Sequence, residues 1–425
     1  MAQRLTSTDL KEALSACGVP DGAPLAVAVS GGPDSLCLVL LASEIANVVC
    51  LTVDHGLRPE SAAESATLEK LMADKGIPCH RLVWQGKKPE ANIQAEARIA
   101  RYHLMNDWCV ANGVGYLLTA HHQDDQAETL LLRLARGSGV YGLAAMPPTS
   151  NMPGTDGRIT LVRPLLGVPK KQLMATLEAM KVGWLEDPSN KAMQFDRVKV
   201  RSFLENPPLE GLRADRLAAT AGRLRRTRDA LEYYENRWLT ENVEYRHDGT
   251  LMFDPAAFDS VPEEIMLRAI ASMCRTVSGE RYVPRMEKLE RAADAMRAPG
   301  FSGLTLYGVQ FIPVSGTQVL ATRELRAAQG RVPVAEGGSW DNRFDISAKG
   351  DIAGLEIGPL GQEGWNRALK AWPDIRQTTL PLAARIVLPA VFDGEDPLAV
   401  PHLEVALGRG NAVSLSLKSH GWPKK

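Results

Sequence analysis

Short apolar runs alternate with longer segments of helical periodicity along the first half of the chain. The runs are rich in Val, Leu and aromatic residues, as buried strands are, and they cover 25–29, 48–53, 78–84, 116–122 and 160–166. Between them, apolar residues recur every three or four positions and predict helices over 33–46, 59–76, 92–113, 123–137 and 169–181. This alternation predicts an α/β fold with a mostly parallel sheet that helices cover on both faces.

The pattern changes at Pro207 and Pro208, where a proline pair interrupts the helical periodicity. A helical pattern is predicted again over 251–296, and short alternating strands with glycine turns follow over 301–324. The remainder mixes one helix near 365–372 with strand-like runs. We therefore expect three domains: an α/β domain over 1–205, a mainly helical domain over 206–330 and a small α+β domain over 331–425.

The composition is that of an ordinary globular protein, with 425 residues, 45% hydrophobic and 23% charged. Six cysteines form no C-x-x-C pair and lie mostly in apolar runs, so they are interpreted as small buried side chains in a reducing compartment. No apolar stretch has the length of a signal peptide or of a membrane span. We expect a cytoplasmic protein without a membrane partner.

The formal net charge is only −1, so any contact with nucleic acid requires a local basic patch. The densest candidate runs from Arg197 to Arg237, with ten Lys or Arg against six Asp or Glu. Such a segment is either a solvated helical face with i,i+4 ion pairs or a surface that faces RNA. The residues alone leave both interpretations open.

The first candidate site is the small-residue turn SGGPDS, which joins the first strand to the next helix. Gly31 and Gly32 allow positive φ and a close approach to an anion, and Pro33 suits a first helical turn. The free N–H groups of that turn predict a phosphate site, in which Asp34 would need Mg²⁺ between its carboxylate and the phosphate. A Gly-Gly turn between strand and helix is also common without any ligand. The predicted site comprises Ser30, Gly31, Gly32, Pro33, Asp34 and Ser35.

The second candidate site is the start of the helix in HHQDDQAETLLLRLARG. Asp125, Glu128 and Thr129 stand at i, i+3 and i+4, which places them on one helix face. Acidic residues in a first helical turn also serve simply as capping charges.

Ligands of parallel α/β sheets bind beyond the carboxyl ends of the strands. We therefore expect the residues at these ends to line one site: Ser30, Asp54, His55, His121 and His122. Adjacent histidines at a strand end point to opposite faces, and no cysteine or third histidine completes a ligand set. A zinc site is disfavoured.

SGGPDS resembles the SGGxDS signature of the PP-loop ATP pyrophosphatases. RGSGVYGL from Arg136, EDPSN at 186–190 and the basic tail that follows narrow the resemblance to the tRNA(Ile)-lysidine synthases within that superfamily. The similar motifs lie mainly between residues 30 and 201, roughly the first half of the chain. WDNRFDI and LPAVFDGEDPLAVPHL also resemble the C-terminal part of that family, with lower specificity.

This resemblance implies a carbon–nitrogen ligase with ATP and Mg²⁺. The family adenylates the C2 carbonyl oxygen of the wobble cytidine, position 34, in the isoleucine tRNA with a CAU anticodon, and the ε-amine of free lysine then displaces AMP. By resemblance, Asp125 and Glu128 hold lysine, while residues 30–35 bind ATP with Asp34 near the metal. Arg98 is a candidate to balance phosphate charge in the transition state of adenylation, or else it is simply an arginine on a helix surface. The middle domain would bind tRNA, and a homodimer remains open.

Parts of the sequence also resemble the motifs of other protein classes. GSGVYG at 137–142 matches G-x-G-x-x-G but follows a helical pattern, so a helix C-cap and a mobile loop are expected instead of a dinucleotide site. Other PP-loop enzymes, such as tRNA thiolases or ammonia-dependent amidating enzymes, would need a persulfide cysteine, C-x-x-C pairs or a glutaminase nucleophile. An ATP-sensing, RNA-binding module without turnover would not require the acids Asp34, Asp125 and Glu128.

Overall fold

The computed structural model describes residues 4–57, 61–86, 88, 93–152, 158–184, 196–280, 282–418 and 422, except for the side chain of Gln94. The chain divides into two compact units, Met1–Asp229 and Ala230–Lys425, and each is considered separately. The boundary falls inside the long helix α9 (Ala214–Asn242). The three-domain division predicted from the sequence stays a prediction.

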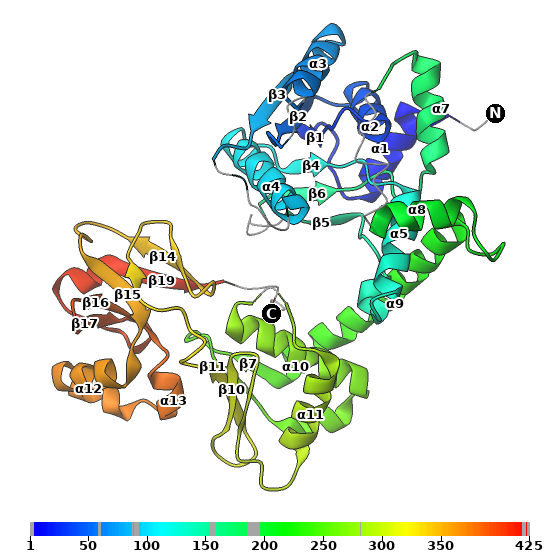
Figure 1. The fold of residues 1–425 in the computed structure, drawn as a ribbon. Helices are drawn as coiled ribbons and strands as arrows, with labels where there is room; N and C mark the ends of the chain where they lie inside the picture. Colours follow the sequence, from blue (N-terminus) through cyan, green and yellow to red (C-terminus); the bar gives the residue numbers. More distant parts are fainter. Residues whose placement is uncertain are drawn as a thin grey trace. The chain divides into compact units, whose positions relative to one another are not determined.

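The first unit is built on a six-stranded sheet of order β3-β2-β1-β4-β6-β5 (Figure 1). All neighbouring pairs are parallel except β5 and β6. This confirms the predicted α/β fold with a mostly parallel sheet. The strands are β1 (Leu25–Ala28), β2 (Val48–Asp54), β3 (Cys79–Val83), β4 (Tyr116–Leu118), β5 (Thr149–Asn151) and β6 (Thr160–Val162).

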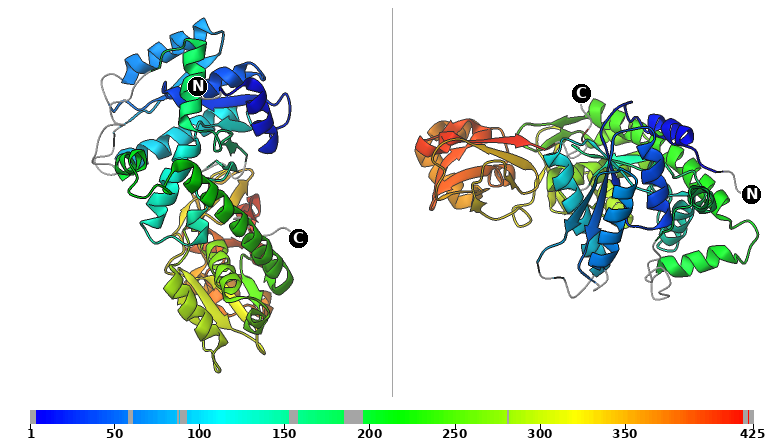
Figure 2. Two further views of the ribbon diagram at one scale, coloured as in Figure 1. Left: turned by 90° about the vertical axis from the view of Figure 1, so that its right-hand side faces the viewer. Right: turned by 90° about the horizontal axis from the view of Figure 1, so that it is seen from above.

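The helices of this unit lie around the sheet in Figures 1 and 2, and those numbered α2 to α5 and α7 match the predicted alternation. They are α1 (Ser7–Ala16), α2 (Pro33–Ser43), α3 (Ser61–Asp74), α4 (Ile93–Ala111), α5 (Gln123–Leu134), α6 (Val140–Leu143), α7 (Lys170–Met180) and α8 (Asp196–Glu205).

Alternate residues of β1 enter two separate cores, which explains why both faces of the sheet are covered. Leu25 and Val27 join a buried cluster with residues of α1, α2, α3 and α7. Ala26 faces the other way and joins a second cluster with Met105 and Cys109 of α4. Side chains of a strand alternate between faces, so a short apolar run without polar positions is the expected pattern for a strand buried on both sides.

The structure differs from three local predictions. The fourth strand was predicted to reach residue 122 but ends at Leu118. Thr119 N–H bonds to Val162 O, and α5 begins shortly afterwards at Gln123. The segment GSGVYG is not only a loop, since it includes the start of the short helix α6. The predicted helical segment over 251–296 begins with a strand, because Leu251 pairs with Ala321 of a neighbouring strand. The segment EDPSN lies outside the described residues.

The second unit begins with an antiparallel sheet of order β7-β8-β11-β10-β9, packed against two amphipathic helices around one core. The strands are β7 (Val243–Tyr245), β8 (Leu251–Phe253), β9 (Leu304–Leu306), β10 (Val309–Pro313) and β11 (Val319–Arg323). The helices are the 3-10 helix η2 (Pro255–Ser260), α10 (Glu263–Ser278) and α11 (Met286–Arg297).

Two further sheets complete this unit, in the orders β12-β15-β16-β17-β18 and β13-β14-β19. The strands are β12 (Val332–Pro333), β13 (Ser339–Trp340), β14 (Phe344–Ala348), β15 (Leu355–Pro359), β16 (Pro389–Asp393), β17 (Asp396–Val400), β18 (Val405–Ala406) and β19 (Val413–Leu417). The helices are α12 (Gly361–Ala371) and α13 (Leu382–Arg385), with the 3-10 helices η3 (Pro373–Gln377), η4 (Pro401–Leu403) and η5 (Gly408–Ala412).

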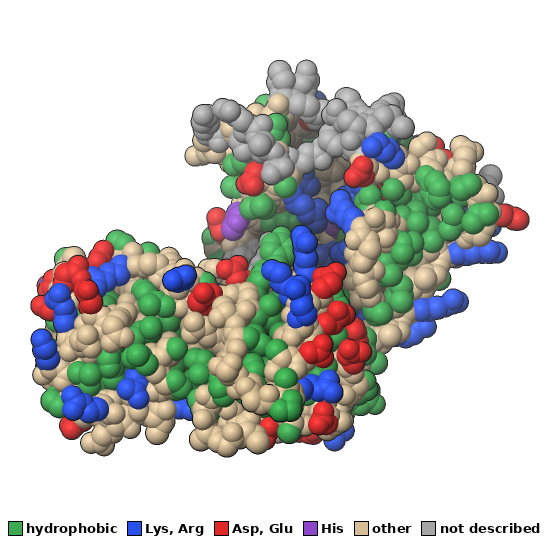
Figure 3. All heavy atoms as spheres, turned by 60° about the horizontal axis from the view of Figure 1, so that its bottom comes forward, with side chains coloured by type: hydrophobic (Ala, Val, Ile, Leu, Met, Phe, Trp, Pro, Cys, Tyr) green, Lys and Arg blue, Asp and Glu red, His purple; other side chains and the backbone are tan. Residues whose placement is uncertain are grey.

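The surface carries charges of both signs. On the face drawn in Figure 3, acidic and basic side chains are interspersed among hydrophobic and other side chains, in keeping with the small net charge. Within the described residues, a helix with both the length and the apolar character for a membrane span is not found.

Candidate active site

The turn between β1 and α2 is held by its own serines. Ser30 N–H donates to Ser35 Oγ at 3.1 Å, and Ser35 Oγ donates to the carbonyl of Gly32 at 3.0 Å. Gly31 has φ of 82°, a value that a residue with a side chain rarely adopts. Pro33 opens α2 in the first helical position, where its missing N–H leaves no bond unmade. The result is a rigid turn at the N-terminus of a buried helix, which is suited to an anion.

His122 joins this turn to the start of α5. Its Nε2 lies 3.5 Å from Asp34 Oδ2 and 3.5 Å from Asp125 Oδ2, and its Nδ1 lies 3.5 Å from Asp124 Oδ2. Burial disfavours the charged imidazole, but the contacts with the carboxylates of Asp124 and Asp34 outweigh it and raise the pKa of His122 to about 10. Three carboxylates thus surround the ring, and their charge favours its protonated form.

The carboxylates of Asp125 and Glu128 lie on the same face of α5. Arg201 of α8 contacts both of them, with Nε 2.5 Å from Glu128 Oε1 and Nη2 3.9 Å from Asp125 Oδ1. The Glu128 side chain is only 2% exposed. Burial raises its pKa, although the hydrogen bond from Arg201 acts in the opposite direction. A largely buried carboxylate that is paired with a guanidinium forms a strong, charge-assisted hydrogen bond.

Two carboxylate oxygens of this cluster are buried and lack a hydrogen-bond partner among the described residues, Asp34 Oδ1 and Glu128 Oε2. Buried polar atoms are rarely left unpaired, so each is an acceptor ready for a cation or a donor. Asp34 Oδ1 fits Mg²⁺, which commonly takes one or two carboxylates and completes its shell with water and phosphate. No group of three or more potential metal ligands occurs in the described part of the chain.

The other strand-end residues form separate local contacts. Asp54 accepts hydrogen bonds from Gly56 N–H at 2.9 Å and from Ser61 Oγ at 2.7 Å, and so joins the end of β2 to α3. His55 Nε2 lies 3.1 Å from Nη2 of Arg101. Both residues lie at the expected edge of the sheet but not in contact with the cluster of Asp34, His122, Asp125 and Glu128.

His121 and Arg98 also have partners of their own. His121 Nδ1 lies 3.0 Å from Thr119 Oγ1, and burial lowers its pKa to about 4. Arg98 is exposed on α4, where Nη2 donates to Tyr102 Oη at 3.2 Å. The structure therefore places Arg98 on a helix surface, and its part in catalysis stays a prediction.

Two members of the cluster were not predicted in their observed roles. His122 was expected at the strand end but not as the group that bridges Asp34 and Asp125. Arg201 was included only in a basic segment, because 73 residues separate it from Glu128 in the chain. The sequence holds a partial signal for the role of Arg201, because R-V-K-V-R places Arg197 and Arg201 on one face of a helix.

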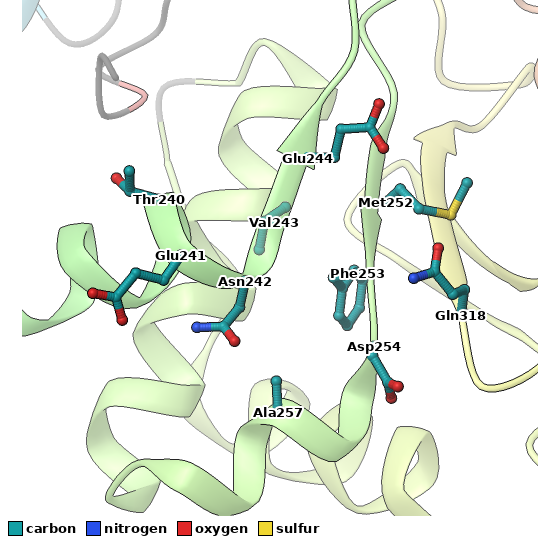
Figure 4. A pocket seen from close by; sticks show the side chains of 10 residues that line it. All are labelled: Thr240, Glu241, Asn242, Val243, Glu244, Met252, Phe253, Asp254, Ala257 and Gln318. Atoms are coloured by element: carbon teal, nitrogen blue, oxygen red, sulfur yellow. The ribbon is translucent and has the colours of Figure 1, made fainter.

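A hollow of about 370 Å³ occurs in the second unit (Figure 4). It opens between the end of α9, β7 and β8, and its acidic lining is largely engaged. Glu241 pairs with Arg237 at 2.8 Å, and Asp254 accepts bonds from Ala256 N–H and Thr317 Oγ1. We assign it no chemistry.

The turn, the parallel sheet and the clustered acids define a PP-loop protein, and the family of PP-loop domains matches residues 5–207. Relatives named tRNA(Ile)-lysidine synthase include one from Ruegeria pomeroyi, 38% identical over 90% of this chain and 90% of its own length. Those from Bradyrhizobium diazoefficiens and Wolbachia pipientis are 38% and 34% identical, over 73% and 77% of this chain and 89% and 77% of their own lengths. The chain belongs to the tRNA(Ile)-lysidine synthase family.

Proposed function

We propose that this chain joins free lysine to C2 of the wobble cytidine in the isoleucine tRNA with a CAU anticodon, using ATP, through an adenylated tRNA intermediate. AMP and diphosphate would be the other products, and decoding would change from AUG to AUA. The observation that carries the proposal is the contact of the loop acid Asp34 and the α5 acid Asp125 with one ring, that of His122, while Arg201 holds Glu128 beside Asp125, in a member of this family.

The acids of α5 are proposed to receive the lysine. Its ε-amine has an ordinary pKa of about 10.4 and is an ammonium near neutral pH, so it must be held as a cation and then lose a proton before it attacks. Glu128 Oε2 can accept a hydrogen bond of that ammonium, because the contact of Arg201 uses Oε1. Asp125 Oδ1 can accept another, since it is Oδ2 that accepts the hydrogen bond from His122 N–H. Asp125, the more accessible of the two acids, would accept the proton.

The turn at Ser30–Ser35 is proposed to hold the phosphates of ATP. Backbone N–H groups at the start of α2 would orient the phosphates, and Asp34 Oδ1 would hold Mg²⁺. When bound, that ion would neutralise phosphate oxygens and assist departure of diphosphate. His122 would keep the Asp34 carboxylate oriented through the contact to Oδ2.

The basic helices α8 and α9 are proposed to contribute to tRNA binding. Arg223 and Arg226 are exposed on α9, and Arg225 is partly exposed. Lys and Arg side chains on one helix are suited to backbone phosphates. A cytoplasmic location, where tRNA, lysine and ATP meet, belongs to the same proposal.

The deciding experiment is mass spectrometry of the CAU-anticodon isoleucine tRNA after incubation with the full chain, ATP, Mg²⁺ and lysine. We expect a mass gain at the wobble cytidine equal to lysine minus water, and AMP in equal amount. Diphosphate release without a mass gain at any concentration of lysine would reject lysine as the second substrate.

A further inference from the structure

Two cysteines face each other across neighbouring strands of the first unit. Cys50 of β2 and Cys79 of β3 are register partners in a parallel pair, so their side chains lie on the same face of the sheet. Their Sγ atoms are 3.0 Å apart. Neighbouring strands lie about 4.8 Å apart, within the range of about 4.4–6.8 Å that Cα atoms of a disulfide span. The spacing of the two strands is therefore compatible with a bond between these sulfurs.

The two thiols differ in exposure and acidity. Cys50 is fully buried, whereas Cys79 lies at the start of the edge strand and is partly exposed. The hydrogen bond with Cys50 lowers the pKa of Cys79, although its partial burial and Glu69 act in the opposite direction. The same contact, together with burial, raises the pKa of Cys50. Cys79 is thus the more accessible and the more acidic of the two thiols, and Cys50 is the neighbour that can resolve its oxidised form.

We propose that Cys50 and Cys79 are a redox modification site, at which a peroxide oxidises the pair to a reversible disulfide between β2 and β3. The Cys79 thiolate attacks one oxygen of hydrogen peroxide, and the other oxygen leaves as hydroxide, which gives a sulfenic acid. The Cys50 thiol then attacks that sulfur, the S–S bond forms, and water departs. In balance, two thiols are oxidised, one peroxide is reduced to two waters, and a dithiol reductant reverses the change.

The remaining cysteines lack these features. The structure describes all six, and it gives no comparable contact between any other two. Cys37 and Cys109 are fully buried, and burial raises the pKa of each to about 12. Cys274 is buried in the second unit, and burial raises its pKa as well. These thiols provide internal controls.

The test treats the full chain with hydrogen peroxide, blocks free thiols under denaturing conditions and maps the peptides by mass spectrometry. We expect Cys50 and Cys79 to lose alkylation together, a peptide pair joined through them to appear with the loss of two hydrogens, and dithiothreitol to restore both thiols. Cys109→Ser should still form the bond.

Variants separate the two steps. Cys50→Ser should give a Cys79 sulfenic acid that a dimedone probe captures, whereas Cys79→Ser should leave Cys50 unreactive. The wild-type chain decides the question even where a variant folds poorly. Full alkylation of both thiols after peroxide, or a Cys79 sulfinic acid beside a free Cys50 thiol, would overturn the proposal.

Discussion

The guanidinium of Arg201 lies against the carboxylate of Glu128, with Nε 2.5 Å from Oε1, although 73 residues separate them in the chain. This contact joins α8 to α5 at the place where the family resemblance puts the amino-acid substrate. One oxygen of Glu128 is thereby occupied by a cation, while Oε2 has no partner among the described residues. A second cation, the ammonium of lysine, would bind a carboxylate whose charge is already balanced in part.

Glu128→Gln should weaken lysine binding without stopping adenylation. The amide keeps the shape but removes a charge-assisted contact of about 1.5–3 kcal/mol, which corresponds to a rise of roughly ten- to more than a hundredfold in the KM for lysine. Diphosphate release with tRNA should persist, because the turn at 30–35 is unchanged. A lysine titration that follows adenylation and lysidine formation separately tests this.

Glu12→Gln is the matched control for that titration, since Glu12 is exposed on α1 of the same unit. It should leave both steps unchanged. If Glu128→Gln lowers both steps equally and high lysine restores neither, the α5 acids serve ATP and magnesium instead.

Asp34→Asn should raise the Mg²⁺ concentration needed for diphosphate release by about 10–100-fold, because a neutral amide is a poorer ligand for a hard cation. The asparagine retains a polar contact for His122, so the change to the fold is smaller than with Asp34→Ala. Diphosphate release measured across a Mg²⁺ titration is the readout. Asp21→Asn, at an exposed position, serves as control. An unaltered Mg²⁺ requirement would remove Asp34 from the metal site.

Much of the site could be predicted from sequence because its parts are local. The β1 strand, the turn and α2 follow from a short apolar run, two glycines and a proline. The shared orientation of Asp125 and Glu128 follows from helical periodicity. By contrast, the contacts of Arg201 with Glu128 and of Cys50 with Cys79 depend on how distant segments pack, and periodicity carries no information about that. The strand β5, TSN, is too short and polar to give a pattern.

Changing Arg223, Arg225 and Arg226 together to glutamate should weaken tRNA binding and reduce its dependence on salt. Each phosphate contact adds somewhat less than one unit to the slope of log K against log salt, so the loss of three contacts should lower the slope by about two to three units. Filter binding across a salt series measures this. Reversal of the exposed residues Arg326, Lys370 and Arg376 controls for total charge. An identical slope in the α9 variant would assign its arginines to a solvated helix face.

Asp341→Asn should destabilise the second unit by about 3–5 kcal/mol, because it removes the charge from a buried ion pair. Asp341 is 4% exposed and lies 2.8 Å from Arg343 Nε and 3.3 Å from Arg323 Nε. Asp345→Asn is the comparison, since Asp345 is 51% exposed and its pair with Lys418 is worth about 1 kcal/mol or less. Urea unfolding of both variants measures the difference. Equal effects would contradict the buried-pair argument.

His402 should make the second unit less stable as the pH falls from about 6.5 towards 4. Burial lowers its pKa to about 4, with His247 and Arg343 acting in the same direction and Asp248 against them. Between these two pKa values the unfolded chain binds a proton that the native state does not. The contribution of neutral His402 to the free energy of unfolding is therefore fully present above the pKa of histidine in the unfolded chain, about 6.5. It is lost as the pH falls below that value, by about 1–3 kcal/mol at pH 4.

His402→Gln isolates that contribution, because glutamine does not titrate. Urea unfolding at pH 7.5, 6, 5 and 4 should show that the stability of the wild-type chain declines more steeply than that of the variant. The buried histidines of the first unit, His55 and His121, add to the decline of both proteins equally and cancel in the difference. Parallel curves would mean that His402 is protonated in the native state and that its pKa is not lowered.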